Sequence, residues 1–150
     1  MSRRVGIVLF EGFELLDVFG PAEAFGVLRK EFELVLVAAE AGPMKSSQGP
    51  RAIADAGFAD CPKLDLVLVP GGIGTRSEVE NASLLGSIRR LAEGAELVLS
   101  VCTGAALLAR AGLLDGRRAT TNKRSFEWVK QQGPRTQWIE QARFVEDGRV

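Results

Sequence analysis

The sequence predicts a three-layer α/β sandwich, in which helices cover both faces of a mainly parallel sheet. Short, continuously apolar runs alternate along the chain with stretches of helical pattern. Strands that are buried on both faces have such runs, and parallel strands are joined by crossovers that are usually helical. The 150 residues contain no internal repeat and no linker, so we predict one domain over residues 1–150.

Four apolar runs predict the buried strands of this sheet. They are "RVGIVLF" at 4–10, "FELVLVA" at 32–38, "LDLVLVP" at 64–70 and "AELVLSV" at 95–101. Shorter strands are predicted in "RRATTN" at 117–122 and at 137–139. The stretch from Glu40 to Pro62 is rich in Gly, Pro and Ser, which predicts a hairpin and loops.

Helices are predicted between and after these strands. The Gly20–Pro21 pair suits a helix start, so the first helix is expected to begin near Pro21. The helix that follows Cys102 is expected to run to about Ala111, where Gly112 caps it. The remaining helices are expected at 81–93 and 123–132.

Charge and cysteine content exclude several classes of function. Lys and Arg together number 19, as do Asp and Glu, so the net charge is zero and we expect no nucleic-acid partner. The first apolar run is far shorter than the roughly 20 residues that cross a bilayer, so we expect no membrane partner. Two cysteines do not make a disulfide framework, and they suggest a reducing, cytoplasmic location. Without histidine or metal-ligand spacing, we expect no metal and no other cofactor.

Three features follow predicted strands at their carboxyl ends, where the ligand crevice of an open parallel sheet lies: the segment around Asp17, the "PGGIG" turn and Cys102. Cys102 joins a strand directly to a helix of small residues, which is the arrangement of a nucleophile elbow. The positive end of the helix dipole there favours a thiolate. A buried structural cysteine, packed as a small hydrophobe, would occupy the same place. The pattern leaves both interpretations open.

Asp17 and the glycine turn also have two interpretations. Asp17 is a lone carboxylate in an apolar run: it either caps the following helix, which the pattern favours, or projects into the crevice as a general acid/base. The backbone amides of Gly71 and Gly72 either belong to a plain turn or point into the crevice as an oxyanion hole. No chemical role is expected for Cys61, which lies in a loop beside Pro62.

The C-terminal "RFVEDGRV" predicts a strand, a type I′ turn at Asp147–Gly148 and the first two residues of a returning strand. The chain stops where that hairpin should close. We therefore expect the domain to lack its C-terminal strand and helix.

Three segments taken together resemble the ThiJ/PfpI superfamily, which has the class I glutamine amidotransferase-like α/β fold. They are "GIVLFEGFELLDVFGP", "DLVLVPGGIGT" and "LVLSVCTGAALLARAGLLDGRRATT", and the resemblance spans the whole chain. It implies a flavodoxin-like sandwich with a mainly parallel sheet and a nucleophile elbow. It also implies that Cys102 is the nucleophile and that the protein is a homodimer acting on a small molecule.

Within this superfamily the chain is most similar to isocyanide hydratase-like members, which share the "LLD…GP" aspartate and the "SVCTG" elbow. This similarity implies a lyase in which the Cys102 thiolate attacks the isocyanide carbon. Water then hydrolyses the thioimidate to an N-formamide, with Asp17 handling the protons. Gly71, Gly72 and Thr103 are expected to contact the substrate or the developing negative charge.

The chain departs from its relatives at positions that bear on the substrate. Protease-like members have a histidine where this chain has Thr103, and amidotransferases need a histidine that this chain lacks. The hydratases carry a histidine and an aromatic residue where this chain has Asn122 and Lys123. Two alternatives therefore stay open: a glyoxalase or deglycase, and a non-catalytic ligand- or redox-sensing domain in which Cys102 oxidises to a sulfinic acid without turnover.

Overall fold

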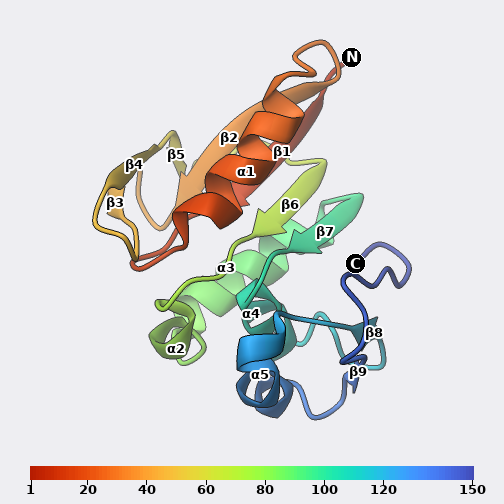
Figure 1. Cartoon of the computed structure of the whole chain (residues 1–150). Helices are drawn as coiled ribbons and strands as arrows, with labels where there is room; N and C mark the ends of the chain where they lie inside the picture. Colours follow the sequence, from red (N-terminus) through yellow and green to blue (C-terminus); the bar gives the residue numbers. More distant parts are fainter.

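A computed structural model describes residues 1–150, and its centre is a five-stranded parallel sheet. The strand order is β5-β2-β1-β6-β7, with neighbours paired in parallel throughout (Figure 1). The bounds of the strands are Arg3–Val8 for β1, Phe32–Ala38 for β2, Ala56–Gly57 for β5, Leu66–Val69 for β6 and Leu97–Ser100 for β7. The four apolar runs of the sequence thus form the four longest strands of this sheet, and the predicted fold class is confirmed.

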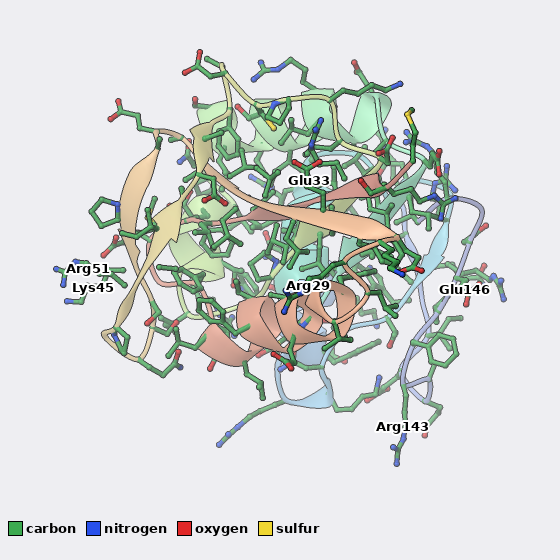
Figure 2. The ribbon with its side chains drawn as sticks, turned by 90° about the horizontal axis from the view of Figure 1, so that it is seen from above. Arg29, Glu33, Lys45, Arg51, Arg143 and Glu146 are labelled. Carbon is green, nitrogen blue, oxygen red and sulfur yellow. The ribbon has the colours of Figure 1, made fainter.

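Helices flank the sheet, as predicted. Their bounds are Leu15–Gly26 for α1, Thr75–Glu78 for α2, Ala82–Glu93 for α3, Gly104–Arg110 for α4 and Phe126–Gln132 for α5. Seen from above, α1 and α3 lie on opposite faces of the sheet (Figure 2). Because both faces are covered, β6 is buried at every position, and its side chains join one continuous hydrophobic core.

Two small two-stranded sheets lie outside the central one. β3 (Gly42–Lys45) and β4 (Arg51–Ala54) form the antiparallel hairpin that the composition of this stretch predicts. β8 (Arg118–Ala119) and β9 (Gln137–Trp138) pair in parallel. Figure 1 shows the hairpin at one end of the molecule and the β8–β9 pair at the other.

The first helix begins earlier than predicted. It starts at Leu15, so Pro21 lies inside it and not at its N-terminus. Two tertiary hydrogen bonds define the start: the Glu14 amide donates to the Gly71 carbonyl at 2.9 Å, and the Leu15 amide donates to Gln48 Oε1 at 3.1 Å. Local sequence cannot reveal partners that lie so far along the chain.

The C-terminal segment turns at Gly148–Arg149, one residue later than predicted, and forms no hairpin. Residues 143–146 are not a strand, and Asp147 lacks the positive φ that a type I′ turn needs at both central positions. Instead, Arg118 donates its backbone amide to Asp147 Oδ2 at 2.8 Å, and the Val98 amide donates to the Arg149 carbonyl at 2.8 Å. The segment therefore packs against β8 and the free edge of β7. The structure contains no helix long and apolar enough to cross a membrane.

Candidate active site

Cys102 occupies a sharp elbow between β7 and α4. Its φ is 54°, and no other non-glycine residue in the chain has a positive φ. This left-handed backbone conformation is unfavourable for an L-residue and needs support from the surrounding structure. The second residue after it has no room for a side chain, because a Cβ on Gly104 would lie 2.2 Å from the Val69 carbonyl oxygen. The strand–helix elbow proposed from the sequence is therefore present in the fold.

Asp17 lies in the first turn of α1 but does not cap that helix. The N-cap position belongs to Glu14, and the Asp17 carboxylate accepts a hydrogen bond from the Gly71 amide at 3.0 Å. The capping interpretation, which the sequence pattern favoured, is therefore wrong. Because α1 begins at Leu15, the carboxylate faces the glycine turn after β6 and can act on groups there.

The glycine turn holds two side chains in place through its amides. Gly71 donates to Asp17, and Gly72 donates to Thr103 Oγ1 at 3.1 Å. There is no room for a side chain at Gly71: its Cβ would lie 2.7 Å from Thr103 N and 2.9 Å from Asp17 Oδ2. In this structure both amides are thus committed to orienting side chains, and their expected contact with substrate stays a prediction.

Thr103 is buried next to Cys102, with its hydroxyl in a small polar network. Thr103 Oγ1 accepts the Gly72 amide and lies 3.1 Å from Thr75 Oγ1, which donates to the Gly72 carbonyl at 2.8 Å. The alternative acceptor for the Thr103 proton, the Gly72 carbonyl, is 3.4 Å away. Each hydroxyl has one proton to donate, so within this network the Thr103 proton has two acceptors, the Thr75 oxygen at 3.1 Å and the Gly72 carbonyl at 3.4 Å.

The two candidate reactive groups influence each other electrostatically. Burial raises the pKa of the Asp17 carboxyl, opposed by the Gly71 amide and reinforced by the charge of Glu14. Burial also raises the pKa of the Cys102 thiol, and the charges of Asp17 and Glu14 raise it further. The Thr103 backbone amide and side chain lower the pKa of the same thiol by hydrogen bonding. The resting pair therefore holds the proton on sulfur and a basic carboxylate near it.

A cavity of about 570 Å³ opens on one side of Cys102. Thr121, Asn122 and Lys123 also line it, whereas Asp17, Gly71, Gly72 and Thr103 do not. Residues 143–146 form part of its lining, and Figure 2 shows that Arg143 and Glu146 both extend from this segment. Cys102 thus lies between a space for a small molecule and the polar cluster that contains Asp17.

Lys123 is tied to its own surroundings, although it lines the cavity. Its ammonium donates to Thr120 Oγ1 at 3.0 Å, to the Thr121 carbonyl at 3.1 Å and to the Ala142 carbonyl. An ammonium has three protons, so these three acceptors occupy it fully. Asn122, which also lines the cavity, has only the Thr121 hydroxyl near its Oδ1, at 3.4 Å.

Three residues that act on the site were missed from the sequence. Glu14 contributes charge to both reactive groups, Thr75 completes the hydroxyl network, and Thr121 donates to the Cys102 carbonyl at 2.7 Å. The "ATT" that contains Thr121 lies inside a segment already matched to the family, which was the available signal. Glu14 and Thr75 carry no local pattern that separates them from ordinary surface and turn residues.

The fold and the elbow define a class: parallel α/β proteins with a cysteine between a strand of the parallel sheet and the helix after it. The chain belongs to the DJ-1/PfpI family, whose model matches residues 3–150. A solved structure of a ThiJ/PfpI family protein from Pseudomonas syringae superposes with a TM-score of 0.88 at 27% identity. That alignment covers 99% of this chain and 61% of the other.

Named relatives differ in what they do. The isonitrile hydratase of Pseudomonas putida is 39% identical over 122 residues, which cover 81% of this chain and 53% of that protein. An HTH-type transcriptional regulator of Pseudomonas aeruginosa is 28% identical over 152 residues, covering 99% of this chain and 45% of the regulator. The chain thus spans about half the length of these two relatives.

Proposed function

We propose that the protein is a cysteine-dependent hydratase that converts a small isocyanide into an N-formamide. The observation that carries this proposal is the pairing of an elbow thiol at Cys102 with a carboxylate, Asp17, that is not used as a helix cap. The 39% identity to an isonitrile hydratase supports the choice of substrate class. The adjoining cavity supports a substrate of small-molecule size.

The first half of the reaction needs one proton transfer in each direction. Asp17 accepts the thiol proton of Cys102, and the raised pKa of Asp17 makes it a stronger base than an ordinary aspartate. The thiolate then adds to the terminal carbon of the isocyanide, forming a C–S bond. Asp17 returns its proton to that carbon, which leaves a neutral thioimidate on Cys102 and an ionised carboxylate.

The second half adds one water. As the water oxygen bonds to the thioimidate carbon, Asp17 takes one of its protons and passes it to the nitrogen. The hydroxyl of this adduct then becomes the formyl carbonyl as the C–S bond breaks, and its proton returns to sulfur. The sum is one isocyanide and one water consumed, one N-formamide released, with Cys102 and Asp17 restored.

This chemistry suits a chain without histidine. No acyl leaving group has to be protonated, so one carboxylate can perform every proton transfer. Thr103 is placed to stabilise the thiolate formed in the first step, because its amide and hydroxyl lower the pKa of that thiol. The raised pKa of the resting thiol in turn protects it from reacting before substrate arrives.

The test is turnover of an aryl isocyanide, followed by the appearance of the formamide. Cys102→Ser should lower kcat/KM by at least about a thousandfold, and Asp17→Asn by about a hundredfold or more. Cys61→Ser is the matched control, because it alters the other free cysteine and should leave turnover unchanged. Wild-type activity in either site variant would contradict the proposal.

The same protein samples separate the alternatives. Turnover of methylglyoxal without turnover of an isocyanide would indicate a glyoxalase or deglycase. Ready oxidation of Cys102 to a sulfinic acid, detected by mass spectrometry with no turnover of either compound, would indicate a sensing domain.

Three further expectations belong to this proposal. We propose a homodimer, supported by the exposed Leu16 and Phe19 on one face of α1. We propose a cytoplasmic location, which fits two free cysteines; recovery from an extracellular fraction would contradict it. The C-terminal strand and helix expected from the sequence stay a prediction. A structure of a longer chain that shows no further strand and no further helix in this domain would contradict it.

A further inference from the structure

Thr121 is a buried residue with a hydrogen bond that the proposed reaction does not use. It follows β8, and its side chain is 7% exposed at the wall of the cavity. Its hydroxyl donates to the Cys102 carbonyl oxygen at 2.7 Å. The other oxygen within reach, Asn122 Oδ1, is 3.4 Å away, so the single hydroxyl proton goes to Cys102.

This hydrogen bond is the one that holds the Cys102 carbonyl. No backbone amide donates to that oxygen, because Gly104 donates to Val101 and Ala106 donates to Thr103 at the start of α4. Cys102 precedes the N-cap residue Thr103, so its carbonyl lies outside the hydrogen bonds of α4. The hydroxyl of Thr121 therefore satisfies an acceptor that the elbow leaves out of the helix.

The carbonyl of Cys102 and the amide of Thr103 are two ends of one peptide unit. A peptide unit is planar, so fixing its oxygen also fixes the direction of its N–H. A hydrogen bond accepted at the oxygen also polarises the unit and strengthens the N–H as a donor. That N–H belongs to Thr103, whose backbone amide favours the thiolate of Cys102.

We propose that Thr121 is a positioning residue for the nucleophile: by holding the Cys102 carbonyl, its hydroxyl aims the Thr103 amide at the Cys102 sulfur. The proposal rests on the proposed function only in taking Cys102 as the reactive group. It gives the segment after β8 a role in setting the reactivity of a thiol that lies 19 residues earlier in the chain.

The charged groups around the thiol stay the same when Thr121 is changed. Asp17 and Glu14 act from the α1 side and raise the pKa of the thiol. On the cavity side the lining contains Arg118, Lys123, Arg143 and Glu146. If an uncharged substitution at Thr121 changes the titration of the Cys102 thiol, the change therefore comes from the peptide unit between Cys102 and Thr103.

The experiment measures alkylation of Cys102 by iodoacetamide against pH, in a Cys61→Ser background so that one thiol reacts. Thr121→Val removes the hydroxyl at constant shape and should move the titration upward by about 0.5–1 pH unit. The alkylation rate at neutral pH should fall about three- to tenfold, since only the thiolate reacts. Thr121→Ser keeps the hydroxyl and should restore the wild-type titration.

Thr120→Val is the matched control. Thr120 is the preceding residue, and its hydroxyl donates to the Ile139 carbonyl at 2.6 Å and accepts from Lys123, without touching Cys102. Cys102 in the Thr120→Val variant should therefore titrate as it does in the wild type. Circular dichroism on each variant confirms that the titrated species is folded.

Each other outcome overturns the proposal. If Cys102 titrates in Thr121→Val as it does in Thr120→Val, the Thr121 hydroxyl does not influence the pKa of the Cys102 thiol. Failure of Thr121→Ser to restore the titration would assign the effect to packing. Alkylation needs no isocyanide, so the expected shift in a protein without turnover would sustain this inference while contradicting the proposed function.

Discussion

At the scale of single residues, the site depends on positions that have no side chain. Gly71→Ala would drive a methyl group against Thr103 and the Asp17 carboxylate, so it should destabilise the fold by about 1–3 kcal/mol and abolish turnover. Gly86→Ala is the control: Gly86 is exposed in α3 with nothing within 4 Å, and alanine there should stabilise by about 0.5–1 kcal/mol. Urea denaturation of both variants checks this. Equal effects of the two substitutions would contradict it.

Residue chemistry could be predicted where it follows from position in the fold. Cys102 and Asp17 became candidates because each follows a strand of a parallel sheet, and the carboxyl ends of such strands meet at one edge. What Asp17 bonds to could not be predicted, since its partner Gly71 is distant in sequence. The contact of Thr121 with Cys102 was not predicted for the same reason, because the two residues meet only in the folded chain.

At the scale of elements, Pro21 is the clearest conflict between local preference and the fold. It is the seventh residue of α1 and lacks the N–H that would bond the Asp17 carbonyl. Pro21→Ala should restore that bond and raise the free energy of unfolding by about 1–2 kcal/mol. The gain is smaller than the full cost of a proline inside a helix, because alanine also gives the unfolded chain more conformational freedom. Thermal unfolding measures the difference. A lower melting temperature would show instead that the helix needs the proline.

Long elements were predictable, and of the short ones β8 and β9 were predicted whereas β5 and α2 were not. The four apolar runs match strands because their hydrophobicity extends along the whole strand and supplies its buried positions. Asn81 caps α3 by accepting the Leu84 amide at 3.1 Å, as its residue type favours. In contrast, β5 and α2 span two and four residues, too few to show any period.

At the scale of the whole molecule, the exposed apolar face of α1 carries the remaining prediction. Leu16 is 76% exposed and Phe19 is 46% exposed, one helical turn apart. If this face is the dimer interface, sedimentation should show a dimer for the wild type. Leu16→Glu should shift the protein to a monomer, whereas Leu28→Glu, at an exposed position just after α1, should not. A wild type that sediments as a monomer at all concentrations would contradict the homodimer.

The tip of the β3–β4 hairpin, residues 46–50, has a consequence for the position of Asp17. Gln48 accepts the first amide of α1 and donates to Glu14 at 2.6 Å, while the Ser47 amide donates to the Phe13 carbonyl at 2.8 Å. The tip thus supports the loop that carries Asp17, yet it lies outside the central sheet (Figure 1). Insertions and deletions are tolerated best in such surface turns. A change in the length of this hairpin would therefore alter the position of the Asp17 carboxylate without altering one residue of the core.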